Sequence, residues 1–140
     1  MLYILDTDHV SFLQRQHSVV LKNLLKVPFE NRAVTVITLA EQLQGRLAAF
    51  RRAKAEAESS RALQFLVQTV EFYQSIKVLL YDKKSAAEFE RLRHHKLRIG
   101  TQDLRIAAIT LANQATVVTR NRRDFIQVPE LIIADWTIPQ

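Results

Sequence analysis

The first eight residues constrain the fold more than any other stretch of this chain. Leu2 to Leu5 form an apolar run that stops at Asp6, and Asp8 follows two positions later. An uninterrupted apolar run is typical of a strand that is covered on both faces, as in a parallel sheet. In such sheets, ligands bind beyond the carboxyl ends of the strands, which is where Asp6 stands. The sequence therefore predicts an α/β sheet with its functional groups at that end.

The rest of the chain alternates between strand and helix patterns. Further strands are predicted at residues 33–37, 78–81, 116–118 and 131–133, and helices at 8–14, 19–27, from 38 onward, 62–75, 83–97 and 101–113. This alternation predicts one three-layer α/β domain over residues 1–140, with about five parallel strands. We expect the first and fourth strands to be neighbours. The helix from 38 and the helix at 62–75 should form a protruding hairpin.

Composition narrows the choice of function. The 140 residues include no Cys, so disulfides and thiolate metal sites are excluded. Acids replace the basic start of a signal peptide, and no apolar run reaches the ~18 residues of a membrane span. We therefore expect a cytoplasmic protein without membrane contact. The net charge of +6 suits a polyanionic partner, although it also fits a merely soluble basic protein.

Four acids stand at comparable places, after strands or at the start of helices: Asp6, Glu41, Asp103 and Asp124. Each has an ordinary explanation. Asp6 and Asp103 suit helix N-termini, Thr38 and Glu41 match a capping box, and Asn121 and Asp124 resemble another cap. Taken singly, capping is the favoured interpretation. Taken together in one crevice, four carboxylates would repel one another, and a divalent cation would remove that conflict. The hypothesis is a site for Mg²⁺ or Mn²⁺, which oxygen ligands select.

Such a site predicts a reaction. A divalent cation polarises a phosphodiester and lowers the pKa of a bound water. The sequence contains no Ser/His/Asp triad, P-loop or Gly-rich dinucleotide loop. We therefore predict metal-assisted phosphodiester hydrolysis by water, without a covalent intermediate. Arg120, Arg122 and Arg123 flank the last acid and are interpreted as phosphate contacts, with a solvated loop as the alternative.

Other residues have structural interpretations. Four basic side chains of the hairpin are expected on a solvated face, with contact to RNA or to an antitoxin as the less favoured alternative: Arg46, Arg51, Arg52 and Lys54. His94 and His95 are expected at the surface, and Trp136 is expected to plug the core at the sheet edge. His9 lies near the acids, but the direction of its side chain is left open.

Several motifs resemble those of PIN-domain ribonucleases, specifically the toxins of VapBC-type toxin–antitoxin pairs. They are ILDTD, TLAEQ, GTQDLRIAA, VTRNRRDF and PELIIADW, in that order, and they span almost the full length. The resemblance implies a metal-dependent endoribonuclease that acts on RNA, forms a homodimer and is blocked by an antitoxin. It implies catalytic, metal-binding roles for the four acids above, with Thr119 and Asn121 lining the site. Asp8 replaces an Asn that is common in the family. It either adds charge near the site or caps the first helix, and the cap is the favoured interpretation.

Two rival functions remain open. A doubly wound phospho-acceptor module would also place acids near its first strand, and Asp82 follows the third strand as an acceptor would. Such a module needs a Lys after its last strand, and residues 131–140 contain none. A DNA nuclease with the same chemistry is the other rival, because contacts to the 2′-hydroxyl, and not the metal, distinguish RNA from DNA.

Overall fold

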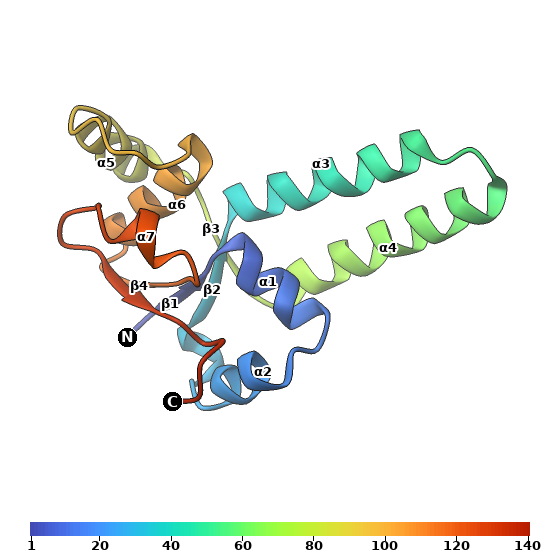
Figure 1. Ribbon diagram of the computed structural model, residues 1–140, viewed down its shortest axis with the longest axis horizontal. Coiled ribbons are helices and arrows are strands. Elements are labelled where there is room, and N and C mark those ends of the chain that lie inside the picture. The colour runs from blue at the N-terminus through green and yellow to red at the C-terminus, as the bar shows by residue number, and fades with distance from the viewer.

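A five-stranded parallel sheet forms the centre of the computed structural model, which describes residues 1–140 (Figure 1). The strands are β1 (Tyr3–Leu5), β2 (Arg32–Thr35), β3 (Lys77–Leu79), β4 (Thr116–Val118) and β5 (Ile132–Ala134), in the order β3-β2-β1-β4-β5. β1 pairs with β2 on one side and with β4 on the other. The predicted pairing of the first and fourth strands is thus confirmed.

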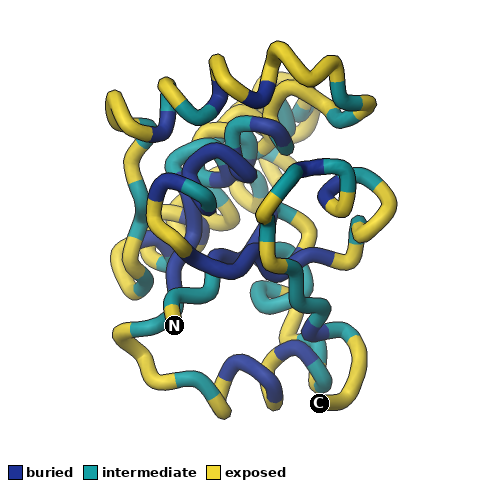
Figure 2. Tube along the Cα trace, turned by 90° about the vertical axis from the view of Figure 1, so that its left-hand side faces the viewer, coloured by how far each residue is buried: buried dark blue, intermediate teal, exposed yellow.

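Helices cover both faces of this sheet. They are α1 (Thr7–Gln14), α2 (Ser18–Leu25), α3 (Val36–Arg52), α4 (Glu56–Gln74), α5 (Lys83–Arg93), α6 (Thr101–Ala112) and the short α7 (Arg122–Phe125). Successive strand residues point to opposite faces. Ile4 accordingly packs in a cluster with Ile109 of α6, whereas Leu5 packs with Val10 and Leu24 of α1 and α2. Figure 2 shows the buried chain in the interior, between more exposed outer segments. This is the predicted three-layer α/β fold.

α3 and α4 run side by side away from the sheet as the expected hairpin (Figure 1). The Arg46 guanidinium lies between them: its Nε donates to Thr69 Oγ1 at 2.9 Å, and its Cζ is 4.0 Å from the centroid of the Phe65 ring. Desolvation lowers the pKa of Arg46. The prediction that Arg46 belongs to a solvated face is therefore wrong, because the side chain joins the two helices. The other three predicted cations are exposed: Arg51, Arg52 and Lys54.

The boundary between β2 and α3 differs from the sequence-based prediction. The strand ends at Thr35 and α3 begins at Val36, two residues before the predicted start at Thr38. Thr35 Oγ1 accepts the hydrogen bond from Thr38 N at 3.2 Å, so Thr35 is the N-cap. The predicted Thr38–Glu41 capping box is wrong. The β-branched pair at 36 and 37 fits a strand pattern but forms the first helical turn here.

Smaller outcomes complete the fold. α4 begins six residues before its predicted start at residue 62, because the Ala-rich charged segment before it favours helix. α7 was not predicted. His94 and His95 are exposed, and Trp136 is 4% exposed with its ring centroid 5.4 Å from that of Tyr3, as expected for a core plug. The structure contains no helix that is both long and apolar enough to cross a membrane.

Candidate active site

A polar hollow of about 170 Å³ lies where β1 ends and α1 begins. Its lining contains no hydrophobic residue and consists of Asp6, Thr7, Asp8, Glu41, Asp103 and Asn121. These residues come from α1, α3, α6 and the loop after β4, together with the residue that follows β1. The parallel sheet therefore brings three of the four predicted acids to one small space, and we call it the acid hollow.

Asp6 both caps a helix and lines the acid hollow. It is the N-cap of α1, and its Oδ1 accepts a hydrogen bond from His9 N at 2.9 Å. Its own backbone N donates to Val118 O of β4 at 3.0 Å, which fixes the residue between the two central strands. The side chain is almost fully buried. The capping and site interpretations of Asp6 are thus compatible, because one carboxylate oxygen is used by the helix.

The His9 side chain contacts the Asp6 carboxylate. The sequence alone left the direction of this side chain open. The imidazole is completely buried, with Nδ1 3.2 Å from Asp6 Oδ1. On the other side of the ring, Nε2 accepts a hydrogen bond from the backbone N of Trp136 at 3.2 Å. Because Nε2 accepts from Trp136 N, Nδ1 is the ring nitrogen that carries a proton and donates it to Asp6. The carboxylate therefore receives two N–H donors from one residue.

Glu41 reaches the acid hollow from the second turn of α3. Its Oε1 accepts a hydrogen bond from Thr7 Oγ1 at 2.8 Å, and Thr7 Oγ1 lies 3.1 Å from Thr38 Oγ1. Sequence reasoning missed this role of Thr7. The sequence carries no signal for this role, because Glu41 lies 34 positions from Thr7.

Asp103 carries the clearest electrostatic signature of the site. Desolvation, and then the negative charges of Asp6, Glu41, Asp124 and Asp8, raise the pKa of the Asp103 carboxyl to about 6. Like charges close together favour the protonated form. All four predicted acids contribute to this repulsion, and three of them line the acid hollow.

Asp124 stands at the rim and does not line the acid hollow. It lies in the first turn of α7, and its Oδ2 accepts a hydrogen bond from Asn121 Nδ2 at 2.9 Å. Thr119 is buried, and its Oγ1 accepts a hydrogen bond from Asn121 N at 2.9 Å, so it shapes the loop from below. Asn121 alone of these two predicted lining residues borders the hollow.

The remaining predicted contacts lie outside the hollow. Arg120, Arg122 and Arg123 are all exposed. Asp8 is exposed at the hollow and sits inside the first turn of α1. Because Asp6 is the cap of α1, the interpretation of Asp8 as the helix cap is wrong. Asp8 instead adds a fourth negative charge near Asp103, which is the alternative interpretation of this residue.

The chemical type of the side-chain donors in the acid hollow suits a hard divalent cation. Every side chain of the acid hollow offers carboxylate, hydroxyl or amide oxygen, and such ligands favour Mg²⁺ or Mn²⁺ over softer metals. In this structure no three His, Asp or Glu side chains are close enough to share one ion. The fit therefore rests on donor chemistry and on the raised pKa of Asp103, and the acid side chains would have to move inward to share a cation.

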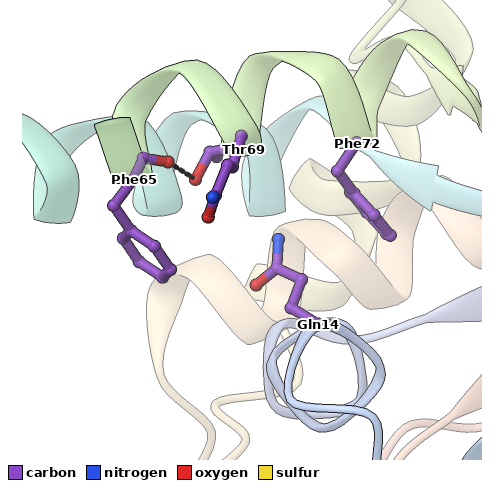
Figure 3. Close-up of a pocket in the computed structure, with 5 residues that line it drawn as sticks. Gln14, Phe65, Thr69 and Phe72 are labelled. Carbon is purple, nitrogen blue, oxygen red and sulfur yellow. Dashed lines mark hydrogen bonds between the residues drawn. The ribbon is translucent and has the colours of Figure 1, made fainter. Parts of the chain in front are cut away.

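A second hollow, of about 210 Å³, has a different character. It lies between α1 and α4, and Figure 3 shows Gln14, Phe65, Thr69 and Phe72 around it. It contains no acid, and Thr69 Oγ1 is already bonded to Phe65 O at 2.8 Å. This hollow has no chemistry of its own and is better suited to contact than to catalysis.

The chain is similar to several known proteins. It is 29% identical to Ribonuclease VapC2 of Rickettsia felis, over 97% of this chain and 98% of the relative. It is 27% identical to the tRNA(fMet)-specific endonuclease VapC of Salmonella typhimurium, over 96% and 97%. A chain in the crystal structure of VapBC2 from Rickettsia felis, bound to a DNA fragment from their promoter, aligns with TM-score 0.72 and 27% identity, over 97% of this chain and 99% of that one. No family model matches the sequence.

Proposed function

Because this chain belongs to the VapC group of PIN-domain toxins, we propose that it is an endoribonuclease whose acid hollow binds Mg²⁺ or Mn²⁺. The observation that carries the proposal is the acid hollow itself, a small polar space lined by Asp6, Asp8, Glu41 and Asp103. Burial and the neighbouring negative charges raise the pKa of Asp103 there. Folding leaves charge repulsion there, and a bound cation would relieve it.

Each residue has a role in this proposal. A bound cation would polarise the phosphodiester and lower the pKa of the attacking water. Asp6, Glu41 and Asp103 would hold it, with Asp124 at the rim. His9 and Thr7 keep the Asp6 and Glu41 carboxylates in place through their hydrogen bonds. The water oxygen would bond to phosphorus as the bond to the leaving oxygen breaks. A carboxylate of the hollow or solvent would accept the water proton, and the leaving oxygen would take up a proton from solvent.

The choice of RNA draws on the relatives. One is named a ribonuclease and another a tRNA(fMet)-specific endonuclease, so structured RNA, including tRNA, is the substrate class to test first. The net charge of +6 favours binding of a polyanion such as RNA. DNA cleavage by the same acids is the alternative, and paired RNA and DNA oligonucleotides of one sequence would separate the two.

The proposal includes two protein partners. The aligned Rickettsia felis chain belongs to a VapBC2 assembly, which supports an antitoxin partner for this chain. We also propose a homodimer, since the hairpin leaves large apolar side chains exposed: Leu63, Phe65, Val67 and Val70. Sedimentation should show a dimer at tens of micromolar (a concentration typical of testing weak association). A monomer at that concentration would remove the homodimer from the proposal.

The decisive experiment removes one acid. Asp103→Asn should reduce RNA cleavage at least ~100-fold, because it takes one charged ligand from the cation, and EDTA should do the same to the parent. Asp82→Asn is the matched control: Asp82 is exposed and caps α5, with its Oδ1 accepting from Ser85 N at 2.9 Å. Asn is an equally good cap. Full cleavage by metal-stripped protein in chelator would refute the metal mechanism.

The same control addresses the phospho-acceptor rival. Asp82 has a structural function as the N-cap, and its hydrogen bonds with Ser85 lower the pKa of its carboxyl. Incubation with a small phosphodonor and Mg²⁺ should leave the parent unphosphorylated. Stable phosphorylation that disappears in Asp82→Asn would favour the rival function.

A further inference from the structure

A single aromatic ring, that of Phe12 on α1, collects an unusual set of cationic and imidazole groups. The Cζ atoms of Arg15 and Arg120 lie 5.4 and 5.6 Å from the ring centroid. The His17 ring centroid lies at 5.4 Å, and the His9 ring meets it edge-on at 5.9 Å. We call Phe12, Arg15 and Arg120 the Phe12 platform. Phe12 is only partly buried, and both arginines are exposed.

The two guanidinium groups of the platform are not neutralised by the protein. The ion pairs of the structure involve Arg91, Arg93 and His9, and neither Arg15 nor Arg120. A guanidinium within about 6 Å of a ring is held by cation–π attraction, while its five N–H donors stay available. Arg91 and Arg93 differ, because Glu88 and Glu90 occupy their donors. The Phe12 platform therefore offers pre-positioned positive charge to an external anion.

The platform adjoins the acid hollow. α1 starts directly after Asp6, and Phe12 lies six residues along, or about 9 Å at 1.5 Å per residue. Arg120 directly precedes Asn121, which lines the hollow. A stacked strand advances about 3.4 Å per nucleotide, so the separation corresponds to two or three nucleotides.

We propose that the Phe12 platform is a nucleotide subsite that holds single-stranded RNA beside the phosphate to be cleaved. This inference rests on the proposed function. A base would stack on the Phe12 and guanidinium layer, and the adjacent phosphate would accept hydrogen bonds from Arg15 and Arg120. Such a subsite has an electrostatic reason. Because the acid hollow repels phosphates, cationic side chains nearby have to hold the RNA.

An acidic protein segment is the other anion that such a surface could attract. RNA is favoured because the ring lies at the centre of the cations, and every base has a face that stacks on an aromatic side chain. Glutamate and aspartate side chains would use the charges and gain nothing from the ring. Removal of the ring therefore separates the two occupants, whereas removal of an arginine does not.

The test measures binding of a fluorescent single-stranded RNA in an Asp103→Asn background, so that the probe is not cleaved. Phe12→Leu keeps an apolar side chain and should weaken binding ~5- to 100-fold, as expected for the loss of one stacked base. Arg15→Gln and Arg120→Gln should each lower the slope of log affinity against log salt by about 0.7. Arg52→Gln, at the end of α3, is the matched control, because it removes an equal charge that is exposed and away from any ring.

Each outcome decides the proposal. Wild-type affinity in Phe12→Leu, together with salt slopes for Arg15→Gln and Arg120→Gln equal to that of Arg52→Gln, would overturn the platform while leaving the proposed function intact. If Arg15→Gln and Arg120→Gln bind a poly-glutamate peptide more weakly but bind RNA as before, the surface binds a protein, and the proposal of an RNA subsite is overturned. If the Asp103→Asn protein without further substitutions binds no RNA, both the proposed function and the subsite that rests on it are refuted. If Phe12→Leu folds poorly, the salt slope of RNA binding by Arg15→Gln, a variant of an exposed residue, still tests the platform: a slope equal to that of Arg52→Gln would overturn it.

Discussion

At the scale of single residues, the site is built by paired interactions that a linear pattern cannot reveal. His9 occupies the buried space between Asp6 on its own helix and the backbone of Trp136, which lies 127 positions later in the chain. The acids themselves could be selected from the sequence, because they recur at strand ends. Thr7 and His9 could not, since their importance depends on which neighbours the fold supplies.

The fixed tautomer of His9 leads to a prediction. His9→Ala removes the donor to Asp6, opens a cavity and leaves the Trp136 N–H without an acceptor, so we expect a loss of about 2–4 kcal/mol in the free energy of unfolding. It should also weaken Mn²⁺ binding about 10-fold or more, because the carboxylate loses its support. His9→Asn places an amide N–H near the position of Nδ1 and should retain most of the affinity. Calorimetric titration with Mn²⁺ and urea unfolding measure the two effects.

His17→Ala is the control for this pair. His17 is partly exposed and caps α2 through Val20 N at 3.3 Å, so its loss should leave Mn²⁺ affinity unchanged. A folded His9→Asn variant with affinity as low as that of His9→Ala would show that the imidazole does not act through Nδ1.

At the scale of elements, most of the chain could be predicted because strand and helix patterns alternate clearly. The five strands, the packing of α6 and the protruding hairpin follow from apolar periodicity and chain order. The junction of β2 and α3 could not be placed, because Val36 and Ile37 suit both elements and Thr35 and Thr38 are both good caps. Tertiary contacts decide between them, as Thr38 is buried against Thr7 of α1.

A substitution at this junction tests the assignment of the cap. Thr35→Val preserves shape and removes the acceptor for Thr38 N, so it should cost about 0.5–2 kcal/mol in the free energy of unfolding. Thr116→Val on β4 is the matched control, because Thr116 is also a buried strand threonine and has no cap to lose. Equal effects of the two substitutions in urea unfolding would contradict the assignment of Thr35 as the N-cap.

At the scale of the whole molecule, the acid hollow connects stability to pH. The folded state holds the Asp103 proton more tightly than the unfolded state, because the folded pKa of about 6 exceeds the ordinary aspartate pKa of 3.8. The stability contributed by this proton is complete below about pH 4 and is lost as the pH rises through about 6. Charge repulsion in the acid hollow therefore lowers the stability of the folded protein at neutral pH, as is common at functional sites.

Removal of the charge should reverse this loss. Asp103→Asn cannot ionise, so its stability relative to the parent should increase between pH 4 and pH 7 in chelator. Each pKa unit corresponds to about 1.4 kcal/mol, and because the side chain is partly exposed, screening should reduce the total gain to about 1 kcal/mol. Urea unfolding at several pH values measures the difference. Asp82→Asn should show no comparable increase over this range, because the pKa of Asp82 is lowered. A flat difference for Asp103→Asn would contradict the repulsion.

The central position of β1 has a consequence for how the protein is made. β1 ends at residue 5, and its neighbour β4 ends at residue 118. The ribosome adds about 5–20 residues per second, so this interval of 113 residues takes roughly 6–23 s. Throughout it the first strand lacks one partner. Asp103 is made only near its end, and Asp124 only after it. A nascent chain therefore cannot assemble the acid hollow until its synthesis is nearly complete.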